Sequence, residues 1–447
     1  MNKVIFRLFM SVLAFSLTTS AFGLEVPLTY ERHPDEAESF LPGGSATLEK
    51  SLDRPAGTWK LPDLKSKQPI YGFAQLGEKK RLLVLDRQKA DDFFYNRLYF
   101  DSNGNGDLTD DTAIDGTFVV ENDEFCRALF PAADTTVDLG GKSLRYSFRV
   151  AVHYFYFGDD GRPDGLLTKE HIDQYLGFDL VTNCSYSGEF ELNGRSYRLA
   201  LADGNTNGHF NDEPSIVHVE ISSCRTVLPI GDQFYLTSDE KISVYNEQPC
   251  GNLLVLDGNL FDVKISISEG KVTLTPVTEN LATVRLAMAA ENMTLYSQND
   301  NDWVMMYRPG TAVMIPQGTY RSMLYTAVRK DEQGDEWFLA ALETNRSPSV
   351  TVDGRTDAIL KFGEPYVPMV TVPEGSRQAV SEGERQVRLM FTVSGAGNEM
   401  LAELTRVSGT RTRIPLSEES RDRPKEPTYR IMKADGEIVA QGSFEYG

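Results

Sequence analysis

The sequence lacks the motifs that identify several large classes of protein. Outside the first 23 residues it has no apolar run long enough to cross a bilayer as a helix. It has no G-x-S-x-G elbow, no G-x-x-x-x-G-K-[ST] phosphate loop and no H-E-x-x-H pair among its five histidines. We therefore expect no membrane span, and no motif supports an α/β-hydrolase, a P-loop nucleotidase or a zinc protease.

Positive charge is also scarce. The chain has 45 Lys and Arg against 65 Asp and Glu, a formal net charge of −20. Nucleic acids and anionic lipids are bound through clustered Lys and Arg, so this balance argues against both as partners. An acidic chain is compatible with cation binding, although net charge also serves solubility.

The first 23 residues have the pattern of a secretory signal peptide. Lys3 and Arg7 form a positive start, residues 12–17 lie in an apolar core, and residues 21–23 form a small-x-small cleavage site. Removing the two basic residues leaves a mature charge of −20 − 2 = −22. The alternative is a membrane anchor, but the apolar run is short for a span. We expect an exported protein that is periplasmic, on the cell surface or extracellular.

Four cysteines lie in the middle of the chain. An even number in an exported protein favours disulfides, and four cysteines allow three connectivities. We expect Cys126 to pair with Cys184 and Cys224 with Cys250, with free buried thiols as the alternative. No C-x-x-C occurs, so neither a zinc ribbon nor a thioredoxin motif is indicated.

Two stretches with oxygen-bearing side chains at alternate positions stand out, at residues 101–111 and 203–213. Calcium takes six to eight oxygen ligands, and a loop with side-chain oxygens at positions 1, 3 and 5 and Gly at 6 can wrap round one ion. Apolar residues at position 8, Leu108 and Phe210, would anchor each loop. The candidate ligands are Asp101, Asn103, Asn105, Asp107 and Asp110 in the first loop and Asp203, Asn205, Asn207, His209 and Asp212 in the second.

These loops resemble EF-hand-like calcium loops, including those of dockerins and thrombospondin type 3 repeats. The resemblance covers the two loops alone and implies bound calcium. Position 12, a bidentate Glu in an EF-hand, is Thr112 in one loop and Pro214 in the other. The closing carboxylate would have to come earlier, from Asp110 and Asp212, with Asp111 and Glu213 next.

A strand pattern precedes each loop, so the flanking helix pair of a calcium sensor is not expected. We interpret the ion as structural, with weak affinity of roughly 10⁻⁴ to 10⁻³ M because few ligands are charged. The alternative is a pair of Asn-Gly turns that bind nothing. Identical residues recur at one offset, 203 − 101 = 102, which indicates an internal duplication.

Between the two copies the sequence predicts an insertion. Residues 158–165 form an acidic loop, and Thr168 would cap a short helix ending near Gly177. Three carboxylates in that loop offer a third cation site, a catalytic pair or simply a solvated turn: Asp159, Asp160 and Asp164. The aromatic run Tyr154, Phe155 and Tyr156 could stack on sugars, although alternate members of a strand are usually core.

Beyond the second loop the patterns are β throughout. Residues 253–275 predict a meander with a turn at Asp257-Gly258. The phrase Pro316-x-Gly318-x-Tyr320 resembles a turn of prealbumin-like sandwiches, and the alternation at residues 387–393 is similar to that of immunoglobulin-like sandwiches.

The sequence thus predicts a mainly β, multidomain protein in which a duplicated β unit with calcium loops is followed by β-sandwich domains. The expected divisions are a signal peptide (1–23), an extended segment (24–69), β units at 70–150 and 151–277, and sandwiches at 278–360 and 361–447. We expect a binding or surface-assembly module whose partner is an unknown protein or polysaccharide. The alternative is a secreted hydrolase, which requires a deep pocket with close carboxylates of perturbed pKa.

Overall fold

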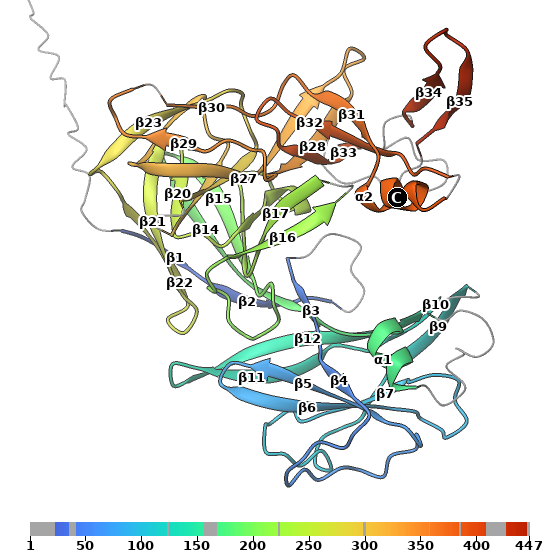
Figure 1. The fold of residues 1–447 in the computed structure, drawn as a ribbon. Helices are drawn as coiled ribbons and strands as arrows, with labels where there is room; N and C mark the ends of the chain where they lie inside the picture. Colours follow the sequence, from blue (N-terminus) through green and yellow to red (C-terminus); the bar gives the residue numbers. More distant parts are fainter. Residues whose placement is uncertain are drawn as a thin grey trace, which may run out of the picture.

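The protein is mainly β and consists of an upper and a lower lobe in the view of Figure 1. The computed structural model describes residues 23–34, 42–122, 125–155, 168–221, 224–297, 301–356, 358–383, 386–407 and 426–444. The predicted signal peptide lies outside these residues except for Gly23, as do the acidic loop at 158–165 with its three carboxylates, and Tyr156. No helix in the described ranges is long and apolar enough to cross a membrane.

The lower lobe contains two facing sheets. One has the order β4-β5-β6-β7-β8 and the other the order β3-β13-β12-β10-β9, with β11 also paired to β12. The strands of the first are Lys50–Ser51, Ile70–Leu76, Lys79–Asp86, Arg97–Phe100 and Ile114–Asp115. Those of the second are β3 Ser45–Thr47, β9 Thr117–Asn122, β10 Phe125–Leu129, β11 Ala133–Leu139, β12 Lys142–Phe155 and β13 Leu176–Thr182.

A short helix lies against the second of these sheets. Helix α1 spans Lys169–Tyr175, and the side chain of Thr168 accepts a hydrogen bond from the backbone N–H of His171. Ile172 is the buried residue of this helix. The predicted cap and helix are confirmed, and β13 begins directly after the helix.

The upper lobe begins with a five-stranded sheet of order β19-β18-β15-β14-β2. Its strands are β2 Thr29–Arg32, β14 Cys184–Leu192, β15 Arg195–Ala202, β18 Gln233–Thr237 and β19 Glu247–Pro249, and the 3-10 helix η2 (Val244–Asn246) precedes β19. Asn193 and Gly194 turn β14 into β15 with φ of 52° and 76°. A type I′ hairpin requires positive φ at both central residues, which is why the pair Asn-Gly favours this hairpin.

A sheet of twelve strands forms most of the rest of the upper lobe. Its order is β1-β22-β21-β20-β25-β24-β27-β28-β33-β32-β31, with β29 paired to β27. The strands are β1 Leu24–Pro27, β20 Leu253–Leu256, β21 Asn259–Ser266, β22 Lys271–Pro276, β24 Asn292–Ser297, β25 Asp302–Tyr307, β27 Gly318–Lys330, β28 Glu336–Leu342, β29 Val350–Val352, β31 Val367–Thr371, β32 Met390–Ser394 and β33 Met400–Arg406. The predicted meander is its β20-β21-β22 section.

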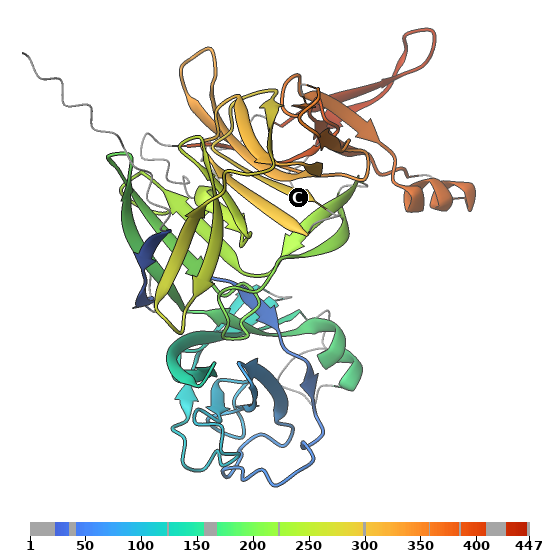
Figure 2. The same ribbon diagram turned by 90° about the vertical axis from the view of Figure 1, so that its left-hand side faces the viewer.

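Two small sheets, a helix and a ribbon complete the upper lobe. β23 (Leu281–Leu286) lies between β26 (Ala312–Pro316) and β30 (Ala358–Leu360), and β16 (Ser215–Ile221) pairs with β17 (Cys224–Ile230). Helix α2 (Glu374–Ser381) and the ribbon of β34 (Thr428–Met432) and β35 (Ile438–Ser443) project from the body (Figures 1 and 2). Asp435 and Gly436, the latter with φ of 89°, lie in the ribbon's turn.

The sheets and cores run across several of the expected divisions. The twelve-stranded sheet takes strands from residues 24–27 to residues 400–406, so the segments 278–360 and 361–447 share it. The expected extended segment at 24–69 contributes β1 to that sheet and β2 to the next. One apolar core includes Phe148 and Phe178 of the lower lobe together with Leu199 and Leu274 of the upper. Local periodicity predicts strands but carries no information on which distant strands pair.

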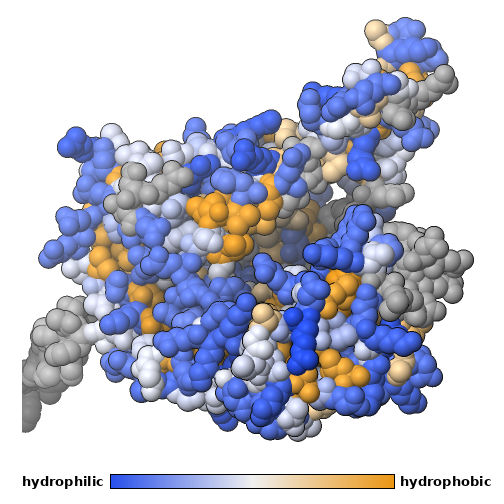
Figure 3. All heavy atoms as spheres, turned by 60° about the horizontal axis from the view of Figure 1, so that its bottom comes forward, coloured by the Kyte–Doolittle hydropathy of each residue, from blue (hydrophilic) through white to orange (hydrophobic). Residues whose placement is uncertain are grey.

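The surface is largely hydrophilic. Figure 3 shows a face on which hydrophilic residues dominate and hydrophobic patches are separate from one another.

The predicted disulfides are absent. Cys126, Cys184, Cys224 and Cys250 are all free, so the pairings Cys126–Cys184 and Cys224–Cys250 were wrong. The physical reason is that the cysteines lie in different places in the fold. Cys126 lies in β10 opposite Tyr154, and Cys250 follows β19. Cys184 begins β14, where its sulfur accepts the backbone N–H of Ser147. Three of the four are buried, which is the behaviour of a small apolar side chain.

This arrangement predicts the outcome of a thiol titration. Protein purified without reductant and unfolded in guanidinium should give about four reactive thiols per chain. In the folded protein Cys126 and Cys184 should react slowly, because burial raises the pKa of each thiol to about 12 and the thiolate is the reactive form. A count near two or zero in the unfolded protein would show that disulfides form.

Candidate calcium loops and the adjoining pockets

The first loop follows β7 and curls around a buried carboxylate. Asp101 is 1% exposed. Its Oδ1 accepts the backbone N–H of Asn105 at 3.1 Å, and its Oδ2 accepts that of Gly106 at 3.2 Å. The carboxylate is therefore wrapped by the chain that follows it.

The asparagines of the first loop continue the curl. The side-chain oxygen of Asn103 accepts the N–H of Asn105 at 2.9 Å, and that of Asn105 accepts the N–H of Asp107 at 2.7 Å. Such side-chain to backbone bonds two residues apart are Asx turns. The amide nitrogen of Asn105 donates to Asp110 at 2.9 Å, so the position-10 carboxylate contacts the middle of the loop.

The second loop follows β15 and repeats the pattern. Asp203 is fully buried and accepts the N–H groups of Asn207 at 3.2 Å and Gly208 at 2.6 Å. The side-chain oxygen of Asn205 accepts from Asn207 at 3.2 Å, and that of Asn207 accepts from His209 at 2.8 Å. The amide of Asn207 donates to Asp212 at 2.6 Å. Each of these bonds has its counterpart 102 residues earlier.

The glycine and apolar positions behave as the pattern predicts. Gly106 and Gly208 have φ of 78° and 86°, which only glycine adopts readily. Leu108 is buried in a small core with Tyr71 and Tyr99. Phe210 is buried edge-on to Tyr186, with ring centroids 4.9 Å apart.

The remaining predicted residues have other partners. Asp107 forms an ion pair with Lys60 at 2.5 Å, and this hydrogen bond lowers the pKa of Asp107 to about 2. His209 contributes its backbone N–H to the curl. Asp111 accepts from the backbone N–H of Ser102, and Glu213 accepts from the amide of Asn301 at 3.2 Å.

A buried guanidinium lies beside the first loop. Arg81 is 2% exposed and donates to the backbone oxygens of Ser102 and Thr136. It also donates to the hydroxyl of Thr135 at 2.7 Å. Its charge is close enough to Asp101 to interact with it electrostatically. The first loop therefore has a positive charge of its own.

The second loop has instead a third carboxylate. Asp232, 1% exposed, accepts the N–H of Gly204 at 3.0 Å and that of Asp212 at 2.7 Å, so it ties the two ends of the loop together. No ion pair to Asp203, Asp212 or Asp232 occurs among the described residues. Sequence reasoning missed Asp232, because Gly231-Asp232 has the composition of an ordinary turn between strands.

Burial without a basic partner raises the pKa values of two carboxyl groups at the second loop, those of Asp203 and Asp232. Burial raises the pKa of Asp203 to about 6, although hydrogen bonds from Tyr146 and from backbone N–H groups oppose the shift. Burial, together with repulsion from Asp203 and Asp212, raises the pKa of Asp232 to about 8. A cation at this loop would remove part of that cost.

The donor set fits a hard cation only in part. In the described ranges no three His, Cys, Asp or Glu side chains converge to hold a metal. A cation in either loop would need asparagine and backbone oxygens as well, and calcium accepts such mixed oxygen sets. In the second loop the amide nitrogens of Asn205 and Asn207 both face Asp212. Both amides would turn their oxygens inward around an ion.

The second loop also connects the lobes. The backbone oxygen of Asn207 accepts the N–H of Gly77, in the turn between β5 and β6, at 2.6 Å. The side chain of Val137 in β11 packs beside Gly208. Ordering this loop therefore orders a contact between the lobes.

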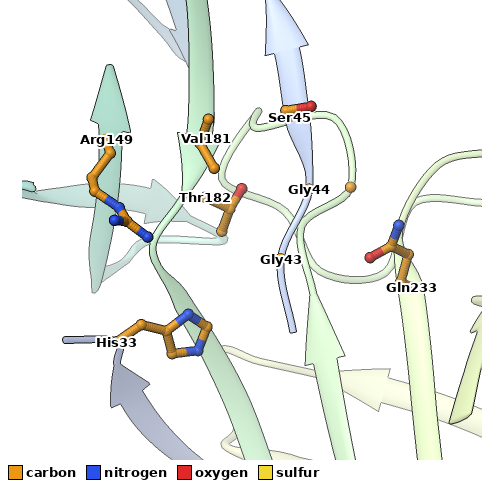
Figure 4. A pocket seen from close by; sticks show the side chains of 9 residues that line it. His33, Gly43, Gly44, Ser45, Arg149, Val181, Thr182 and Gln233 are labelled. Atoms are coloured by element: carbon orange, nitrogen blue, oxygen red, sulfur yellow. The ribbon is translucent and has the colours of Figure 1, made fainter. Parts of the chain in front are cut away.

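A pocket of about 450 Å³ lies beside the second loop, where the chain passes between the lobes (Figure 4). His33 and Arg149 lie on one side of it and Gln233 on the other, with Gly43 and Gly44 between them. His33 is 5% exposed and its Nε2 is 3.0 Å from the hydroxyl of Ser185. Burial and the nearby Arg149 lower the pKa of His33 to about 4, so the imidazole is neutral at pH 7.

A second pocket, of about 310 Å³, lies between the five-stranded sheet and the twelve-stranded sheet. Its lining contains the three carboxylates Asp232, Glu247 and Glu403, and the aromatic rings of Tyr245 and Phe338. The two pockets share Gly204 and Gln233.

Comparisons with known proteins return no match: no family model, no curated protein and no solved structure resembles the chain.

The anchoring of the second loop predicts the effect of removing its apolar side chain. Phe210→Ala should lower the free energy of unfolding by about 3 to 5 kcal/mol, because it leaves a cavity against Tyr186 and Tyr146. Phe155→Ala is the control, since Phe155 is 44% exposed and should cost far less. Equal effects in denaturant titration would show that Phe210 is not an anchor.

Proposed function

We propose that this chain is an exported binding or surface-assembly protein whose β framework is stabilised by calcium in its two loops. The observation that carries the proposal is the repeated curl around Asp101 and Asp203, in which identical residues recur at five loop positions, 1, 3, 5, 6 and 10. Two chance turns would not be expected to share buried carboxylates, Asx bonds, a closing amide and an apolar anchor.

The ligands would be side-chain oxygens at positions 1, 3, 5 and 10 of each loop, with backbone oxygens completing the set. Calcium supplies charge and no chemistry in this role. It holds the loop closed and offsets the desolvation of the carboxylates. Calcium suits these loops better than magnesium, because magnesium demands a near-ideal octahedral geometry and releases its waters reluctantly.

The two loops should differ in affinity. Arg81 and Lys60 already place positive charge at the first loop, whereas the second contains Asp203, Asp212 and Asp232 and no ion pair within the described residues. The second loop therefore gains more from an ion. Since it contacts Gly77 of the other lobe, its ion would stabilise the junction of the lobes.

The alternative, a secreted hydrolase, is favoured by one observation. The smaller pocket contains carboxylates of raised pKa, Asp232 and Glu247. Hydrolysis by an acid and base pair requires two carboxyl groups that face the substrate. Both oxygens of Asp232 accept backbone N–H bonds from the loop, so Asp232 serves the loop, and binding accounts better for this pocket. The partner we propose for the module is a protein or polysaccharide outside the cytoplasm.

Unfolding in calcium tests this proposal. With affinities of roughly 10⁻⁴ to 10⁻³ M, 10 mM calcium should raise the free energy of unfolding by about 1.4 to 2.7 kcal/mol per site relative to chelator. Asp203→Asn should remove most of the rise and Asp101→Asn less of it. Magnesium should be weaker.

Asp262→Asn is the matched control, because Asp262 is exposed on β21, away from both loops. Its calcium response should equal that of the wild type. If the wild-type curves in calcium and chelator superimpose, the loops are ordinary turns and the calcium proposal fails.

A further inference from the structure

The smaller pocket adjoins the second loop through Gly204 and Asp232, but none of the proposed calcium ligands lines it. One side is formed by η2 and β19, and the other by β27, β28 and β33 of the twelve-stranded sheet. The amide of Asn292 in β24 donates to the backbone oxygen of Tyr245 at 2.5 Å and so holds η2 against that sheet. The two sides of the cavity are therefore held in place relative to each other.

One face of the twelve-stranded sheet forms the apolar side. Phe338, Ala340 and Leu342 alternate along β28 and so point to the same face. Leu324 is paired with Leu342, and Thr326 with Ala340, on the neighbouring strand β27. These side chains offer few hydrogen-bonding groups, so a ligand here has to bury apolar atoms.

The opposite side adds an aromatic ring. Tyr245 of η2 packs on Phe338, with ring centroids 3.8 Å apart. Tyr325 lies between Leu324 and Thr326 on β27, and its side chain points to the other face of the sheet, where its ring packs on Phe362, so Tyr245 and Phe338 supply the rings of the cavity. The faces of aromatic rings attract cations, and clusters of such rings are the usual site for organic ammonium groups.

Besides Asp232, which bonds the second loop, two carboxylates give the cavity its charge. Glu247 lies on β19 opposite Tyr235, whose hydroxyl donates to its Oε2 at 3.3 Å. Among the described residues, that hydroxyl is the hydrogen-bond partner of the Glu247 carboxylate, and Glu247 forms no ion pair. Glu403 lies on β33 directly opposite Ala340. Of the described residues that line the cavity, none is Lys, Arg or His.

Glu247 has an energetic reason to attract a cation. Burial raises the pKa of Glu247 above the ordinary value, because the carboxylate is removed from water, and the hydrogen bond from Tyr235 opposes this shift. A positively charged group beside it would restore the lost stabilisation. An inorganic ion is poorly matched to this cavity, since calcium needs six to eight oxygens and much of the wall is aliphatic or aromatic.

We propose that this cavity binds a small organic cation, an ammonium group with an apolar substituent. The ammonium lies against Glu247 and the aromatic rings, and the substituent lies on the face of β28. A volume of about 310 Å³ is at the lower end of the range for small-molecule pockets, so the ligand is small. The site does not depend on the calcium proposal, because neither Glu247 nor the rings belong to the loops.

Calorimetric titration of the full mature chain with choline tests this inference. The control ligand is 3,3-dimethylbutan-1-ol, which has the same shape and no charge. Choline should bind at least tenfold more tightly than the alcohol, both in millimolar calcium and in chelator. Glu247→Gln should weaken choline at least tenfold and leave the binding of the alcohol unchanged.

Glu332→Gln is the matched variant, since Glu332 is exposed in the turn between β27 and β28 and should leave binding unchanged. Circular dichroism and the calcium response of Glu247→Gln check that it folds. The inference is overturned if choline does not bind at millimolar concentration, if the alcohol binds equally well, or if Glu247→Gln has no effect. Displacement of choline by calcium would also overturn it, by identifying an inorganic cation as the ligand.

Discussion

The structure depends on one buried carboxylate, that of Asp203, at the junction of the two lobes. It is fully buried, accepts backbone N–H bonds from the loop that follows it, and receives the hydroxyl of Tyr146 at 2.8 Å. A buried carboxylate without a basic partner is costly unless hydrogen bonds or a cation compensate it. This requirement explains why the loop wraps the carboxylate. Asp232 bonds the loop at Gly204, and Asn207 of the loop contacts Gly77.

Local structure could be predicted from the sequence because its causes are local. Asn193-Gly194 specified a hairpin, Thr168 specified a helix start, and positions 1, 3, 5 and 10 of each loop specified the curl. Asp232 could not be found this way, since it is far from Asp203 in sequence and its role depends on strand pairing. The twelve-stranded sheet was missed for the same reason: pairing of β1 with β22 joins residues almost 250 apart.

The cysteines illustrate a different failure. An even number in an exported chain is a statistical argument for disulfides, and it contains no geometry. Cys126 and Cys184 fill separate parts of one core, where they pack as small apolar side chains. Their separate positions in the core therefore exclude a disulfide between them. The two loops, similar in sequence, also differ through their surroundings, since Arg81 reaches the first from β6 and Asp232 reaches the second from the start of β18.

The most direct measurement of the central claim is a crystal structure of the protein grown in millimolar calcium. The account predicts an ion beside Asp203 with six to eight oxygens at about 2.3 to 2.6 Å, and with the amide oxygens of Asn205 and Asn207 turned toward it. It also predicts lower occupancy, or none, beside Asp101. The account would be contradicted if no ion were present and the amide nitrogens of Asn205 and Asn207 still donated to Asp212.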